Sequence, residues 1–161
     1  MTQTSMQVCL SEPELAALAA VMAALLRPGV CVALRGDLGA GKTTFARALI
    51  RALADDRDLE VPSPTFALRQ DYETPRGLVV HFDFYRLTDA AEIIELGFDE
   101  AISSAITIVE WPERAETMLP ADRIDMQLTE AHTANCRKLR VDGHGAAETI
   151  VAKLAQRTQQ G

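Results

Sequence analysis

The spacing of apolar residues predicts a chain in which helices and strands alternate. An Ala- and Leu-rich segment that ends near Leu26 repeats its larger apolar residues on one helical face, and Ser11 with Glu14 forms a capping box at its start. Continuous apolar runs at 30–34 and 105–109 are typical of strands that are buried on both faces of a sheet. The pattern therefore favours an α/β protein.

The middle of the chain adds an antiparallel component. Apolar segments at 66–73 and 78–85 are separated by the short turn 74–77, which predicts a hairpin. Further strands near the edge of the sheet are expected at 123–128 and 138–141, and further helices are expected at 42–53, 89–96, 100–104 and 146–156. We expect one domain over residues 1–161, with a frayed tail at 157–161.

Composition narrows the class of protein. Of 161 residues, 48% are hydrophobic and 24% are charged, and 16 Lys+Arg against 23 Asp+Glu give a net charge of −7, which disfavours tight unaided binding to nucleic acid. Cys9, Cys31 and Cys136 are widely spaced with no CxxC pair, which favours reduced cysteines. The uncharged stretch 15–26 is shorter than the roughly 18 residues that span a bilayer. We expect a cytoplasmic protein that does not contact a membrane.

The strongest chemical motif is a glycine-rich loop between the strand at 30–34 and the helix at 42–53. It matches GxxxxGK[ST] in full, in the order Gly36, Asp37, Leu38, Gly39, Ala40, Gly41, Lys42, Thr43. Glycines let backbone N–H groups surround phosphate oxygens, and the positive end of the following helix faces the anion. We expect Lys42 to reach the β- and γ-phosphates, Thr43 to bind Mg²⁺, and Thr44 to contact the α-phosphate.

Two acidic residues at strand ends complete a candidate magnesium–nucleotide site. Asp83 and Glu110 each follow an apolar strand, and ligands of open α/β sheets bind at the carboxyl edge. One carboxylate can bind the metal, directly or through water, while the other orients or deprotonates the attacking water. The sequence alone leaves open which acid has which role.

Other residues near these motifs have two readings each. Thr65, in a Pro-containing loop, is either a metal-sensing switch residue or an ordinary threonine. Trp111 either packs near the nucleotide or anchors the core, and Arg86 either stabilises phosphate charge or forms a surface ion pair. His81 shares a strand face with Asp83 and is expected to be structural.

The combined motifs resemble the TsaE (YjeE) family. The resemblance spans 36–112 and is carried by the glycine-rich loop, by Pro62-Ser63-Pro64-Thr65-Phe66, by His81-Phe82-Asp83-Phe84-Tyr85-Arg86-Leu87, and by Ile108-Val109-Glu110-Trp111-Pro112. It implies a P-loop three-layer α/β sandwich with a mixed, partly antiparallel sheet. It also implies an ATPase that works with TsaD and TsaB in threonylcarbamoylation of the tRNA adenosine beside the anticodon, with tRNA contacted indirectly through that complex.

The same resemblance implies roles for matching positions. ATP and Mg²⁺ are the implied cofactors: the glycines and Lys42 hold phosphate, Thr43 and Glu110 hold Mg²⁺, Asp83 is the Walker-B-like acid, and Thr65 lies in a switch-like loop. The adenine contacts match no motif in this sequence, and we hypothesise that they lie near Ser11 or within 131–136.

Three other functions remain open from the sequence. A small-molecule P-loop kinase is the main alternative, although no compact Arg cluster follows the P-loop helix as a lid would require. A GTP-dependent switch lacks an NKxD-type guanine signature. A nucleotide-sensing adaptor without catalysis would retain binding and lack hydrolysis.

Overall fold

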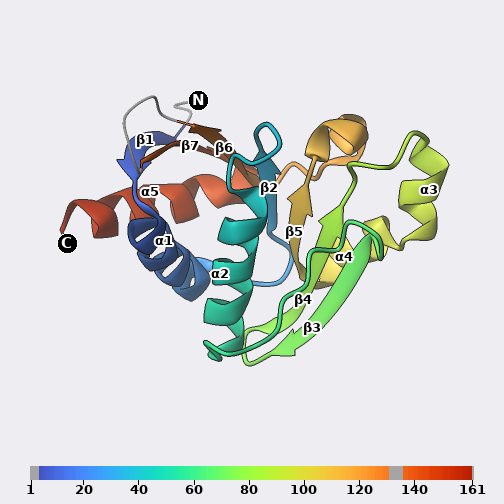
Figure 1. The fold of residues 1–161 in the computed structure, drawn as a ribbon, viewed down its shortest axis with the longest axis horizontal. Coiled ribbons are helices and arrows are strands. Elements are labelled where there is room, and N and C mark those ends of the chain that lie inside the picture. Colours follow the sequence, from blue (N-terminus) through green and yellow to red (C-terminus); the bar gives the residue numbers. More distant parts are fainter. Residues whose placement is uncertain (1–3, 131–135, 161) are drawn as a thin grey trace.

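One mixed sheet organises the molecule (Figure 1). In residues 4–130 and 136–160, which the computed structural model describes, seven strands lie in the order β1-β7-β6-β2-β5-β4-β3. Strands β6, β2, β5 and β4 are parallel, and antiparallel strands extend the sheet on both sides. The strands are β1 Ser5–Leu10, β2 Cys31–Arg35, β3 Arg69–Thr74, β4 Gly77–Asp83, β5 Ile106–Glu110, β6 Arg123–Glu130 and β7 Arg137–His144.

Helical elements cover both faces of this sheet. One face carries α1 Glu12–Leu25, α2 Lys42–Ala54 and α5 Glu148–Gln159, and the other carries α3 Ala90–Glu95, α4 Phe98–Ser104 and the 3₁₀ segment η1 Pro112–Met118. A short 3₁₀ turn, η2 Gly145–Ala147, precedes α5. The result is a three-layer α/β arrangement.

Each face has its own apolar core. The larger cluster packs α1, α2 and α5 against the sheet through residues such as Phe45, Leu49 and Leu154. In the smaller cluster Phe82, Phe84 and Phe98 are fully buried, with ring centroids 5.3 to 5.4 Å apart. Burial on both faces explains why the central strands read as continuous apolar runs.

Helix α1 begins where the capping box predicts. The Glu14 backbone N–H donates to Ser11 Oγ at 3.4 Å, and the Ser11 N–H donates to Glu14 Oε1 at 3.1 Å. These bonds satisfy two of the donors that a helix leaves unpaired at its first turn.

Several predicted boundaries and positions differ in the structure. The strand predicted from Phe66 begins at Arg69, because 64–67 form a turn that the Leu68 N–H closes on the Pro64 carbonyl at 2.6 Å. The second hairpin strand spans Gly77–Asp83, and helix α5 continues past the predicted end at 156 to Gln159.

The edge of the sheet was also placed wrongly by the sequence pattern. Strand β6 is an inner strand that pairs with β2 and β7, and the outer strand is β1, for which no strand was predicted. Buried and more exposed residues alternate along β6. Alternation reports that one face is uncovered, whereas hydrogen-bonding neighbours depend on pairings distant in sequence.

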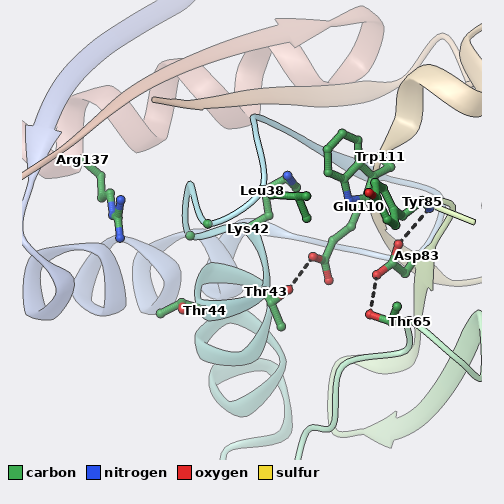
Figure 2. Close-up of a pocket in the computed structure, with 12 residues that line it drawn as sticks. Leu38, Lys42, Thr43, Thr44, Thr65, Asp83, Tyr85, Glu110, Trp111 and Arg137 are labelled. Carbon is green, nitrogen blue, oxygen red and sulfur yellow. Dashed lines mark hydrogen bonds between the residues drawn. The ribbon is translucent and has the colours of Figure 1, made fainter. Parts of the chain in front are cut away.

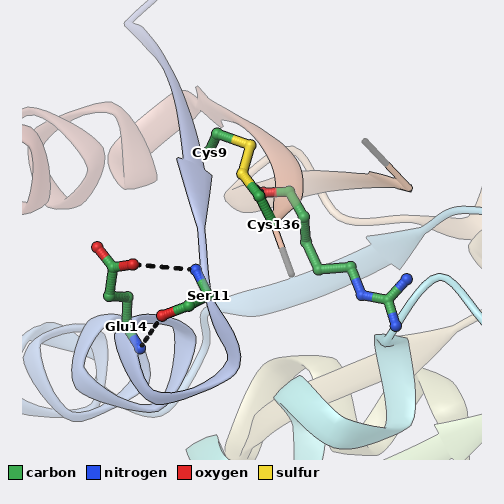
Figure 3. The surroundings of a disulfide bond; sticks show 5 residues. Cys9, Ser11, Glu14 and Cys136 are labelled. Carbon is green, nitrogen blue, oxygen red and sulfur yellow. Dashed lines mark hydrogen bonds between the residues drawn. A yellow bond between two sulfur atoms is a disulfide. The ribbon is translucent and has the colours of Figure 1, made fainter. Parts of the chain in front are cut away.

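Two cysteines are joined, contrary to the expectation that all are reduced. Cys9 at the end of β1 and Cys136 just before β7 form a disulfide, with Cα atoms 5.7 Å apart (Figure 3). Their separation of 127 residues hid this proximity, which arises because β1 pairs antiparallel with β7 and Cys9 lies opposite Lys138. Cys31 is free and buried in β2.

Among the described residues, no helix combines the length and apolar character needed to cross a bilayer.

Candidate functional site

The glycine-rich loop connects the carboxyl end of β2 to the first turn of α2. At Gly36, φ is +146°, and a Cβ there would lie 2.5 Å from the Leu128 carbonyl oxygen of β6. Gly41 precedes α2 with φ +104°, in the left-handed region. Glycine is therefore required at Gly36 by close backbone approach and at Gly41 by backbone conformation.

The Lys42 ammonium is held inside this loop. Its Nζ donates to the carbonyl oxygens of Gly36 and Asp37, the latter at 3.0 Å, and lies 3.9 Å from the Trp111 ring centroid. Only 5% of Lys42 is exposed, and desolvation lowers its pKa, although the nearby Glu110 carboxylate opposes the shift. The loop thus presents a buried cation that an anionic ligand would stabilise.

The two predicted acids meet at the carboxyl edge of the sheet. Asp83 ends β4, Glu110 ends β5, and they are register partners in adjacent parallel strands. Exposed fractions of 4% and 2% show that both carboxylates are buried beside the loop. The sequence-based prediction that each acid lies at the carboxyl edge of the sheet agrees with this geometry, and the pairing of β4 with β5 is what brings the two together.

Glu110 is fixed by hydrogen bonds from two elements. Thr43 Oγ1 donates to Glu110 Oε1 at 2.6 Å, and His81 Nε2 lies 2.6 Å from Glu110 Oε2. The fully buried His81 can donate this bond through Nε2, because a carboxylate ion only accepts hydrogen bonds. The histidine expected to be structural therefore touches one of the two candidate acids.

Asp83 is held by the loop that follows α2 and by its own strand end. Thr65 Oγ1 donates to Asp83 Oδ2 at 3.1 Å, and the Tyr85 backbone N–H donates to Oδ1 at 2.9 Å. Ser63 Oγ lies 2.8 Å from Thr65 Oγ1. The Thr65 loop is consequently in direct contact with the acid at the end of β4.

These side chains line one cleft of about 310 Å³ (Figure 2). Its lining residues are Leu38, Gly39, Gly41, Lys42, Thr43, Thr44, Thr65, Asp83, Tyr85, Glu110, Trp111 and Arg137. Three predicted phosphate-loop residues do not line the cleft. The carbonyl oxygens of Gly36 and Asp37 accept hydrogen bonds from Lys42 Nζ, and Ala40 is buried.

Three further residues line the cleft. Tyr85 and Trp111 belong to the motifs, and their rings pack with centroids 4.9 Å apart; of the two readings given for Trp111, the structure supports the one beside the cleft. Arg137 is the first residue of β7. The Nε atom of Arg137 lies close to Gly41, since a Cβ placed on that glycine would be 3.7 Å from it. The Nη1 atom of Arg137 is 3.2 Å from Glu130 Oε1. The motifs that contain the aromatic pair also contain Asp83 and Glu110, which is a local signal for Tyr85 and Trp111, whereas the position of Arg137 depends on strand pairing.

The remaining sequence-based assignments fall elsewhere. The Arg86 guanidinium carbon lies 5.2 Å from the Phe66 ring centroid. Ser11, one hypothesised adenine contact, is engaged in the capping box of α1. Residues 131–135 lie outside the described residues.

Comparison with known proteins decides the family. The model of the family described as "Threonylcarbamoyl adenosine biosynthesis protein TsaE" matches residues 9–139, most of the chain. The chain belongs to the TsaE family.

TsaE relatives match at substantial identity. The Rickettsia bellii tRNA threonylcarbamoyladenosine biosynthesis protein TsaE is 42% identical over 118 residues, which cover 73% of this chain and 81% of the relative. The protein of the same name from Aquifex aeolicus is 39% identical over 132 residues, covering 81% and 90%.

A solved structure supports the TsaE assignment at the level of fold. The crystal structure of Bacillus subtilis YdiB superposes with a TM-score of 0.77 at 25% identity, covering 98% of this chain and 99% of that chain. The predicted fold class, a P-loop α/β sandwich with a mixed sheet, is confirmed by this similarity and by the strand order.

Proposed function

We propose that this TsaE-family chain is a magnesium-dependent ATPase required for threonylcarbamoylation of the tRNA adenosine next to the anticodon. Family membership supports the pathway. The observation that best supports ATP hydrolysis with Mg²⁺ is the 2.6 Å hydrogen bond between Thr43 Oγ1 and Glu110 Oε1, beside the Lys42 ammonium. A P-loop, a hydroxyl and a carboxylate are the parts that a magnesium–nucleotide site needs.

The donor set at Thr43 and Glu110 fits Mg²⁺. Hydroxyl and carboxylate oxygens are the hard ligands that this ion prefers, and phosphate oxygens and water complete its shell in nucleotide sites. When bound, Mg²⁺ would neutralise charge on the β- and γ-phosphates. Lys42 would exchange its loop carbonyls for phosphate oxygens, which relieves the cost of burying its charge.

The same contacts suggest separate roles for the two acids. Glu110 accepts a hydrogen bond from the threonine of the P-loop, which supports a role for it at the metal. Asp83, at the end of the neighbouring strand β4, is bonded to Thr65 and to the Tyr85 backbone. These contacts support a role for Asp83 in orienting the attacking water and accepting its proton. Thr65 would then link the state of the terminal phosphate to its loop.

The nucleoside end of ATP lies toward Arg137 in this proposal. Lys42 and Thr43 serve the β- and γ-phosphates, so Thr44 and the Gly41 end of the loop serve the α-phosphate. Arg137 stands at that end of the cleft, opposite the acids (Figure 2). Its guanidinium can pair with phosphate or stack on a base.

Partners follow from the family and from charge. We propose that the chain acts with TsaD and TsaB and meets tRNA through that complex. A net charge of −7 supports docking on protein over unaided binding to tRNA. The cytoplasmic location remains a prediction.

The test uses the only tryptophan as a probe. Because Trp111 contacts Lys42, its fluorescence should change when Mg²⁺–ADP or Mg²⁺–ATP binds. Lys42→Ala should weaken binding, and Glu110→Ala should abolish the Mg²⁺ dependence and the hydrolysis that TsaD–TsaB stimulates. Undiminished stimulated turnover in either variant would refute the assigned roles.

The small-molecule kinase alternative is tested in the same assay. A kinase would accelerate strongly with a sugar or nucleoside acceptor, and an ATPase would hydrolyse ATP without any acceptor. A large acceptor-dependent rate would overturn the ATPase proposal in favour of the kinase.

A further inference from the structure

The Cys9–Cys136 bond lies at the end of β1. Met6, Val8 and Leu10 of this strand pack into the core with α1 and α5, so Cys9, which alternates with them, lies on the opposite face of the sheet. Cys9 is exposed, and its direct partner across the strands is Lys138. Cys136 therefore sits diagonally from Cys9, at a spacing that cross-strand side chains can bridge. Cys9 is thus open to solvent as a residue.

A shallow cleft of about 360 Å³ adjoins this residue. Its lining includes Cys9 together with the cationic side chains of Lys138 and Arg140. Arg140 also pairs with Asp142 at 2.9 Å on the same strand. Two cations beside an exposed cysteine suit a small molecule that carries both carboxylates and a sulfur atom.

The same bond is one residue away from the proposed nucleotide cleft. Cys136 precedes Arg137, the first residue of β7, and Arg137 is the register partner of Leu10, which follows Cys9. The disulfide therefore links β1 to β7 next to Arg137, whose side chain extends toward Gly41. Figure 3 shows the bond beside the start of α1. Among the described residues, Arg137 is also held by its pairing with Leu10 and Glu130 and by the ion pair of its Nη1 with Glu130 Oε1 at 3.2 Å, an exposed contact that constrains the side chain weakly.

We propose that Cys9 and Cys136 are a thiol–disulfide exchange site for a small carboxylate-bearing disulfide, and that their bond holds Arg137 in position for the nucleotide. The second half rests on the proposed nucleotide site. The oxidised form then binds nucleotide more tightly, because Arg137 is ordered before binding.

Oxidised glutathione is a disulfide of this class, and its reaction with the two cysteine thiols balances in atoms and electrons. The thiolate of one cysteine attacks a glutathione sulfur, one reduced glutathione leaves, and a mixed disulfide remains. The second thiolate attacks the protein sulfur of that mixed disulfide, and the second reduced glutathione leaves. Two electrons pass from the protein to glutathione, and the two thiol protons end on the two departing thiols.

Cys31 provides an internal reference for the chemistry. It is fully buried, and burial raises the pKa of its thiol to about 11. Alkylation followed by mass spectrometry should therefore label Cys9 and Cys136 only in the reduced protein and leave Cys31 unlabelled in both states.

The experiment compares the full chain after treatment with oxidised glutathione and after reduction. Mg²⁺–ADP affinity is measured by Trp111 fluorescence. We expect reduction to weaken binding by about 2- to 10-fold, the effect of leaving one long side chain unordered. The Cys9→Ser/Cys136→Ser double variant should match the reduced protein under both treatments, and Arg137→Gln should remove the difference between the two states.

A second small disulfide, cystamine, tests whether the site prefers a reagent that carries carboxylates. Cystamine carries amines in place of carboxylates, so it should form the bond more slowly than oxidised glutathione, and Lys138→Gln should reduce that preference. Equal rates for both reagents, or equal nucleotide affinity in both redox states, would overturn the proposal. Absence of binding in both states would instead refute the proposed function, and the nucleotide half of this inference with it.

Discussion

The contact between His81 and Glu110 gives a prediction with a definite size. Replacing His81 by Leu removes the donor at 2.6 Å and leaves a buried Glu110 oxygen without that bond. Loss of a hydrogen bond to a buried charged group costs about 1–3 kcal/mol, which for a domain of this length lowers Tm by about 2–12 °C. Loss of a residue that orients a metal ligand weakens metal binding by about 10–100-fold.

Two controls separate this effect from general damage to the fold. His81→Gln places an amide donor near the position of Nε2 and should restore much of the Mg²⁺ affinity. His144 pairs with Asp125 at 2.8 Å away from the cleft, so His144→Leu should leave Mg²⁺ affinity unchanged.

The assay is a Mg²⁺ titration at fixed ADP, followed by Trp111 fluorescence, together with thermal unfolding. The account expects His81→Leu to shift the Mg²⁺ midpoint and Tm together. Wild-type Mg²⁺ affinity in His81→Leu would refute the inference that this histidine orients Glu110.

Three further predictions concern other parts of the molecule. Gly36→Ala should destabilise the protein by about 1–3 kcal/mol in chemical denaturation, and by more than Gly29→Ala, since a Cβ on Gly29 would meet no atom within 4 Å. Reduction of the Cys9–Cys136 bond should lower stability by up to about 4–5 kcal/mol, since it closes a loop of 127 residues; an unchanged Tm would contradict this. Desolvation lowers the Lys42 pKa below 10.5, so nucleotide binding should take up a proton and weaken as pH rises through that lowered pKa, measurable by calorimetry in buffers of different ionisation enthalpy.

The sign of the Lys42 effect on folding also follows from its lowered pKa. The unfolded chain binds a proton at Lys42 more readily than the folded chain does, so this residue favours folding increasingly as pH rises between the two pKa values. A bound phosphate would reverse the effect by stabilising the charged form. Nucleotide should therefore protect the protein more at neutral pH than in strong alkali.

Local motifs made much of the site predictable from sequence. The glycine-rich loop is contiguous, so its place between β2 and α2 follows from one strand and one helix. Asp83 and Glu110 were each predicted to lie at the ligand-binding edge of the sheet because each follows an apolar strand, and the structure places both at the carboxyl edge, as register partners. His81 belonged to the same motif, yet its contact with Glu110 required knowing that β4 and β5 are adjacent.

Features that depend on pairing between distant segments escaped prediction. Arg137 enters the cleft, and Cys136 reaches Cys9, because β7 lies between β1 and β6. No local pattern fixes that order, since alternation in a strand reports burial of its faces and is silent about its neighbours. Polar and apolar residues alternate along β1, which is a strand signal, although no strand was predicted there.

The central claim is that the loop from Gly36 to Thr44 holds the phosphates of ATP, with Mg²⁺ between Thr43 and Glu110. The most direct measurement is a crystal structure of this chain with Mg²⁺ and a non-hydrolysable ATP analogue. The account predicts phosphate oxygens on the loop amides and on Lys42 Nζ, and a metal ion in contact with Thr43 Oγ1 and the Glu110 carboxylate. A nucleotide bound elsewhere, or a metal that touches neither side chain, would contradict it.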